Sequence, residues 1–146
     1  RSTYKVKRKN RIFLKNFPNT EYAIDLKFKM DLITNQLAAK EMYVAKYYTA
    51  NQKWIPAINR LKVVVKDYSE TVFIEEALHR LVEIYYRVGL IEEAKAAAAI
   101  LGYNYNSSEW YAQSYKVLNK NYKIPKKSEQ KSNDGLIKRT IKKILN

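Results

Sequence analysis

Two stretches decide the fold of this chain: Tyr48–Leu61, which reads YTANQKWIPAINRL, and Tyr85–Ala98, which reads YYRVGLIEEAKAAA. Their first residues are 37 positions apart, and three further pairs share that spacing: Ala57 and Ala94, Leu61 and Ala98, Tyr68 and Tyr105. An aromatic residue followed at fixed distances by small and aliphatic residues is typical of helix–turn–helix units that stack into a solenoid. We therefore predict an all-α solenoid of antiparallel helix pairs, with these packing positions: Tyr48, Ala57, Leu61, Tyr85, Gly89 and Ala94.

The composition fits a single helical domain. The chain has 146 residues, 47% of them hydrophobic, with only three Gly and three Pro to form turns. It has no Cys, which excludes disulfides, a thiol nucleophile and a lipid-attachment cysteine within these residues. No apolar run is long enough to span a membrane, and the first residues, RSTYKVKRKN, lack the apolar region of a signal peptide. We expect the chain to be a mature form or a fragment of a longer protein.

The charge is concentrated at the two ends. The net charge is +14; residues 1–16 hold seven basic residues and no acid, and residues 120–146 hold nine basic and two acidic residues. The intervening residues 17–119 hold 12 basic and 12 acidic residues, so the expected repeat domain is neutral. A nucleic-acid-binding fold more often carries its charge on the folded face, so we expect no nucleic-acid partner. Basic ends still allow weak binding to anionic surfaces.

Hydrophobic spacing and turn signals predict the helices. Residues 21–50 show a three–four apolar spacing without Pro or Gly, and we expect these positions to face inward: Ala23, Leu26, Met30, Ile33, Leu37, Met42, Ala45 and Tyr48. Residues 54–66 form the expected partner helix, with Pro56 in its first turn. A second pair is predicted at about 71–88, capped by Thr71, and at 91–101, ended by Gly102. Gly89 suits the position just after the first of these helices.

The sequence predicts different structures at the two ends of the repeat domain. Residues 1–16 are either a helix over the last ten positions, finishing a preceding repeat, or a flexible basic arm. Asn19 or Thr20 is expected to cap the helix that follows Pro18. Ser108 is expected to cap a helix at about 109–119 that covers the end of the stack. Residues 121–133 have the composition of a solvated linker. Residues 135–145 have the pattern of a short basic amphipathic helix.

No catalytic constellation is present in the sequence, so we expect a protein without enzymatic activity, cofactor or metal. His79 is the only histidine, which argues against a histidine-based metal site, and we interpret it as structural. Glu75–Glu76 and Glu92–Glu93 are adjacent on helices, where neighbours point about 100° apart, so neither is a matched acid–base pair. We interpret both pairs as solvated.

Several tyrosines and Arg60 are candidates for binding a partner. Tyrosines are enriched at interfaces, and we expect Tyr43, Tyr47, Tyr86 and Tyr111 to be the more exposed ones. Arg60 follows Ala57 by three positions and should lie at the edge of its helix. A guanidinium there can form a bidentate pair with a partner carboxylate, although periodicity alone equally allows a solvated arginine.

Several phrases then resemble one known family. FPNTEYAIDLKFKMDLI, KWIPAINRLKVVVKDYSET and EEALHRLVEIYYRVGLIEEAKAAAAILGYNYNSSEWY look like the C-terminal repeats of the BamD family, the tetratricopeptide-repeat lipoproteins of the outer-membrane β-barrel assembly machinery. The resemblance covers about residues 17–118, in order and spacing. It implies a tetratricopeptide-repeat domain over 17–119, between a basic segment, 1–16, and a basic tail, 120–146.

The resemblance also implies a function. Members of that family are scaffolds at the periplasmic face of the outer membrane; they dock on a POTRA domain of the barrel-forming subunit BamA and support the folding of outer-membrane proteins. The family's AxNR arginine matches Arg60 in AINR, so the resemblance implies partner binding by Arg60, with Asn59, Lys53 and Trp54 beside it. The family's lipid-carrying cysteine and first repeats have no counterpart here, so outer-membrane substrates are expected as indirect partners only.

Two other functions compete with this interpretation. One is a repeat adaptor that binds peptides or other envelope proteins. The other is a binder of anionic surfaces that acts through its basic ends. If the chain is a different repeat adaptor, it should not be retained on immobilised POTRA domains. If it binds anionic surfaces, its affinity for them should fall steeply as the salt concentration rises.

Overall fold

A computed structural model describes residues 2–106 and 108–120, and it is all-helical over those residues, which confirms the predicted class. The helices are α1 (Ser2–Asn16), α2 (Glu21–Ala50), α3 (Trp54–Asp67), α4 (Ile74–Arg87), α5 (Ile91–Asn104) and α6 (Glu109–Leu118). Residues 2–16 are therefore helical, not an irregular arm. The predicted linker at 121–133 and tail helix at 135–145 lie outside the described residues.

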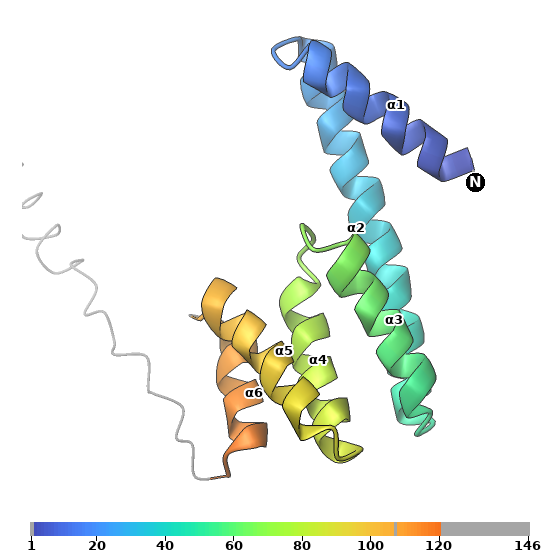
Figure 1. Cartoon of the computed structure of the whole chain (residues 1–146). Coiled ribbons are helices and arrows are strands. Elements are labelled where there is room, and N and C mark those ends of the chain that lie inside the picture. The colour runs from blue at the N-terminus through green and yellow to red at the C-terminus, as the bar shows by residue number, and fades with distance from the viewer. Residues whose placement is uncertain (1, 107, 121–146) are drawn as a thin grey trace, which may run out of the picture.

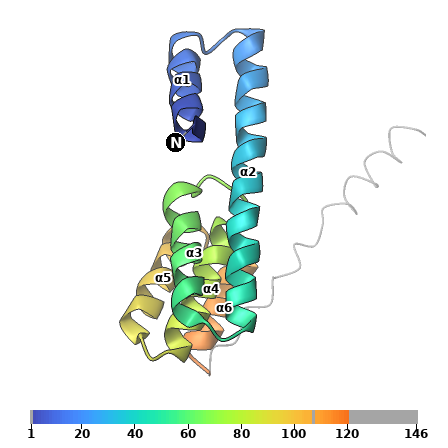
Figure 2. The ribbon, with the colours of Figure 1, turned by 90° about the vertical axis from the view of Figure 1, so that its right-hand side faces the viewer.

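The helices form stacked antiparallel pairs (Figure 1). α2 pairs with α3, α4 pairs with α5, and α3 packs on α4 to join the two pairs. α6 packs on α4 and α5, at the far end of the stack. α2 is 30 residues long, more than twice the length of α3, so its N-terminal half extends beyond the stack, where α1 lies against it (Figure 2).

The core lies where the four central helices meet. Ala57, Leu61, Tyr85 and Ala94 are all buried in one cluster, and Tyr48 packs against its side. Ala57 and Ala94 have no exposed surface, which lets the paired helices approach closely. A smaller cluster of Ile74, Leu78 and Leu101 continues the core toward α6.

Caps and turns separate the helices. Thr20 caps α2 by accepting a hydrogen bond from the backbone N–H of Ala23 at 3.2 Å, and Ser108 caps α6 by accepting from Tyr111 at 3.1 Å. Gly89 has φ +85°, the left-handed conformation that glycine adopts without steric cost after a helix. The predicted cap at Thr71 is wrong: α4 begins at Ile74, because the Thr71 hydroxyl instead donates to the carbonyl of Tyr68 at 2.7 Å within the preceding turn.

The predicted stop at Gly102 is also wrong. α5 continues through this glycine to Asn104. A Cβ at position 102 would lie 2.9 Å from Cε2 of Tyr111, closer than side-chain atoms pack. The glycine therefore provides space for the Tyr111 ring of α6 and does not end the helix.

The inward face predicted for residues 21–50 holds for only part of α2. Ala23, Met42 and Ala45 are buried, and Ala38, which was not among the predicted positions, is fully buried. Ile33 was predicted to face inward, but it is 48% exposed. It lies in the half of α2 that extends beyond α3, so no helix of the stack covers it there.

Candidate protein-interaction site

Arg60 lies on the edge of α3 that borders α2. Its Nη1 donates to Oε2 of Glu41 on α2 at 3.1 Å. The Arg60 side chain is 46% exposed, whereas the Glu41 side chain is 17% exposed. The guanidinium is therefore anchored to the fold by one nitrogen and still faces solvent.

The other three residues predicted to bind a partner do not gather around Arg60. Lys53 is exposed and lies two helical turns from Arg60 on the same edge, whereas the exposed Asn59 points about 100° away. Trp54 is half-buried: it packs against the core, and the guanidinium of Arg87 lies 5.4 Å from its ring centroid. Trp54 thus connects α3 to α4, and Arg60 and Lys53 are the pair that share one accessible edge.

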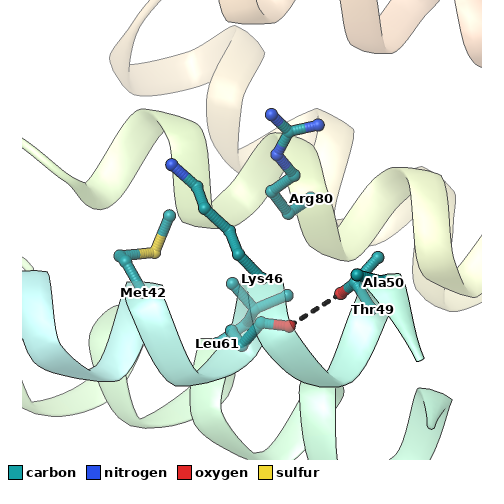
Figure 3. Close-up of a pocket in the computed structure, with 7 residues that line it drawn as sticks. Met42, Lys46, Thr49, Ala50, Leu61 and Arg80 are labelled. Carbon is teal, nitrogen blue, oxygen red and sulfur yellow. Dashed lines mark hydrogen bonds between the residues drawn. The ribbon is translucent and has the colours of Figure 1, made fainter. Parts of the chain in front are cut away.

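A cavity of about 250 Å³ opens between α2 and α4 (Figure 3). It lies on a different side of α2 from Glu41, the partner of Arg60. Its lining includes Met42 and Ala45 of α2 and Leu61 of α3, all buried. Lys46 of α2 and Arg80 of α4 line the same cavity (Figure 3). Its volume lies below the range of about 300–1,000 Å³ that is usual for small-molecule sites, which argues against a cofactor pocket.

Both cations beside this cavity are paired with carboxylates of α4. Lys46 Nζ lies 2.9 Å from Glu76 Oε1, and Arg80 reaches that same oxygen at 3.5 Å. Arg80 also donates to Glu83 at 2.9 Å. Glu76 was predicted to be solvated, but its side chain is only 16% exposed, because it joins α2 to α4 through Lys46.

His79 is buried in a polar cluster between α4 and α6. Its Nδ1 lies 2.8 Å from the hydroxyl of Ser114, and that hydroxyl donates to the carbonyl of Trp110. Nε2 lies 3.5 Å from Glu83, and hydrogen bonds from His79 and then Arg80 lower the pKa of that carboxyl to about 2.

The tyrosines predicted to be exposed divide into two groups. Tyr43 and Tyr47 are 75% and 59% exposed on α2, and Tyr86 is exposed at the end of α4. Tyr111 is half-buried, since its ring packs over Gly102. Among the residues with a described burial, Tyr103 is the most exposed large hydrophobic side chain at 90%, and helical periodicity did not single it out.

Within residues 2–106 and 108–120, no three His, Asp or Glu side chains converge as metal ligands do. Over the same residues, no helix has the length and apolar character needed to cross a membrane.

The arrangement defines a class: a repeat protein built of stacked antiparallel helix pairs. A family model described as "YfiO: Outer membrane lipoprotein" matches residues 2–100, from α1 through most of α5. The chain therefore belongs to the YfiO family.

Three relatives in this family carry the same name, outer membrane protein assembly factor BamD. The chain is 44% identical over 108 residues to that of Caulobacter vibrioides, an alignment covering 74% of this chain and 35% of the relative. It is 46% identical over 106 residues to that of Rickettsia prowazekii, covering 73% and 42%. It is 29% identical over 102 residues to that of Neisseria meningitidis serogroup A, covering 70% and 38%. The chain thus spans about two fifths of the length of these relatives, or less.

Sequence reasoning missed the acidic partner of Arg60. Glu41 lies 19 positions before Arg60, and the pair forms only because α2 and α3 are antiparallel. Ser114 was missed for a similar reason, since a serine in a helix gives no local signal that a histidine of another helix will bind it.

Proposed function

We propose that this chain is a non-enzymatic scaffold in the assembly of outer-membrane β-barrel proteins, acting at the periplasmic face of the outer membrane. Its membership of the YfiO family, together with relatives named assembly factors, is the observation that carries this proposal. The stacked helices suit the role, because a solenoid offers extended surfaces to partners without chemistry of its own.

The proposed partner is a periplasmic POTRA domain of BamA, and the proposed contact is the edge of α3. Arg60 supports this choice because its guanidinium has one nitrogen on Glu41 and remains 46% exposed. An arginine can make further charge-assisted hydrogen bonds to a carboxylate or to backbone carbonyls of a partner. Lys53, two turns away on the same edge, adds a second cation. Outer-membrane substrates and other subunits of the machinery would be reached through this contact.

A charge-swap series tests the contact. Arg60→Glu should weaken retention on immobilised POTRA domains at least about tenfold, the scale of a lost charged hot spot. That substitution also places two carboxylates together at Glu41, so it alone does not separate binding from folding. Arg60→Glu combined with Glu41→Arg restores an ion pair between α2 and α3 and should still bind weakly.

Two outcomes contradict the proposed contact. One is full recovery of POTRA binding in the swapped double variant, because Arg60 would then act only within the fold. The other is equal loss in Lys116→Glu, a matched charge reversal at an exposed position of α6. Failure of the unaltered chain to be retained at moderate salt would contradict the proposed function itself.

A second candidate is binding to anionic surfaces through the basic ends. One observation favours it: Arg8, Lys9, Arg11 and Lys15 are all exposed on α1. This function predicts that cosedimentation with anionic vesicles falls steeply with salt and is lost when these four residues are changed to Gln. POTRA retention should survive the same changes if the first proposal holds.

A further inference from the structure

An apolar groove runs between α3 and α5. α3 and α5 both pack on α4, which forms the floor with the buried side chains of Leu78, Leu81 and Tyr85. The groove has a volume of about 400 Å³. All of its lining residues lie on α3, α4 and α5.

The middle of the groove wall formed by α5 consists of small side chains. Ala96 and Ala97 line it, so only methyl groups stand between the groove and the α5 backbone. Ile100 at one end of this wall is 44% exposed. From Glu93 to Ile100 the wall spans two helical turns, about 10 Å. A helix can approach such a wall closely, as small residues allow, and place the side chains of two of its own turns on the floor.

The wall formed by α3 carries the charge. Lys62 and Lys66 are one turn apart on this rim, both are exposed, and neither has an ion pair with any residue in the described ranges. Glu93 is the one acidic side chain in the lining. The two lysines therefore leave the rim with an excess of positive charge next to an apolar floor.

We propose that the groove between α3 and α5 is a docking site for an amphipathic helix of a partner protein that carries carboxylates on the flank facing Lys62 and Lys66. Its apolar face would cover Val65, Ala96 and Ile100, the apolar lining residues that keep accessible surface, and its carboxylates would pair with the two lysines. The basic C-terminal segment of the chain has the wrong charge for this rim, since it holds Lys138, Arg139, Lys142 and Lys143. This site is separate from the proposed POTRA contact at Arg60, and neither proposal depends on the other.

Two labelled amphipathic helical peptides test the site. They share one leucine stripe and differ only in flanking residues, Glu in one and Lys in the other. Fluorescence anisotropy with the full chain at physiological salt should show binding of the Glu peptide and at least about tenfold weaker binding of the Lys peptide. Lys62→Glu combined with Lys66→Glu should reverse this preference.

A second pair of variants locates the binding. Ala96 lines the groove and is exposed, so Ala96→Phe should fill the groove without disturbing the core and weaken the Glu peptide at least about tenfold. Ala99, also exposed on α5, does not line the groove, and Ala99→Phe is the matched control that should bind normally. Circular dichroism checks that both variants stay helical.

Three results would overturn the proposal. The first is equal binding of the two peptides. The second is equal behaviour of the Ala96 and Ala99 variants when both are folded. The third is self-association of the chain that Ala96→Phe abolishes, because a second copy would then be the occupant.

Discussion

The two halves of α2 belong to one uninterrupted helix and lie in different environments. In the C-terminal half, Met42 and Ala45 are 2% and 1% exposed, because α3 packs along this half and both residues belong to the central core cluster. In the N-terminal half, Ile24 and Phe28 are 67% and 68% exposed, and α1 is the helix that lies alongside. Apolar residues occur in both halves, so hydrophobicity alone does not distinguish them. The difference lies in how far the neighbouring helices extend.

The largest expected difference between the halves is in core packing. Met42→Ala should lower the free energy of unfolding by about 2–5 kcal/mol, as expected when a buried side chain is truncated. Phe28→Ala removes a larger side chain and should cost only about 0.5 kcal/mol or less, because most of it already faces water. Urea denaturation followed by circular dichroism measures both. Comparable losses would mean that the N-terminal half is packed in solution.

Lowering the pH should destabilise the fold through Glu83 of α4. Its pKa is lowered to about 2 from 4.5, so its ion pairs stabilise the fold above pH 4.5, and that contribution is lost as the pH falls through about 2. The side chain is 38% exposed, so screening limits the expected contribution to about 1 kcal/mol.

The comparison of unaltered chain with Glu83→Gln isolates this effect from the other carboxylates. Thermal unfolding of the two proteins should differ near pH 6 and converge toward pH 2. A difference that stays constant over this range would show that Glu83 acts by packing alone.

A smaller effect is expected at the ion pair that joins the packed half of α2 to α4. Lys46→Met should cost about 0.5 kcal/mol, because Lys46 is 55% exposed and Glu76 retains Arg80 as a partner. Raising the salt concentration should reduce the difference between Lys46→Met and the unaltered chain. A salt-independent loss would point to the methylene groups of Lys46, which line the adjacent cavity.

The smallest effect is expected at the border between the halves. Asn35 Oδ1 accepts a hydrogen bond from the backbone N–H of Val72 at 3.4 Å, a long bond at an exposed site. Asn35→Ala should therefore change the free energy of unfolding by a few tenths of a kcal/mol. Amide exchange at Val72 is the sharper measurement, since this N–H should lose protection while the amides of α4 keep theirs.

Much of the fold could be predicted from the sequence because the information was local. The spacing from Tyr48 to Tyr85 gave the helix pairs, and the confirmed caps at Thr20 and Ser108 are local hydrogen bonds. The errors arose where another helix decides the outcome. Gly102 resembles a helix stop until the ring of Tyr111 is placed beside it, and Ile33 resembles a core residue until the length of α3 is known.

The candidate site was less predictable for the same reason. Arg60 could be chosen by its place in the helix and by resemblance, but its partner Glu41 could not, because it lies on the other helix of the pair. The groove between α3 and α5 has no continuous signature either, since its lining comes from three helices.

The bond between Arg60 and Glu41 also affects how a partner could bind at this edge. A free arginine has considerable rotamer freedom, and fixing it in a complex costs roughly 0.5–1.5 kcal/mol. In this chain one nitrogen of Arg60 is already held by a mostly buried carboxylate on the neighbouring helix. Part of the ordering cost is thus met when the chain folds, so a molecule that docks on α3 meets a preorganised guanidinium and loses less entropy on binding.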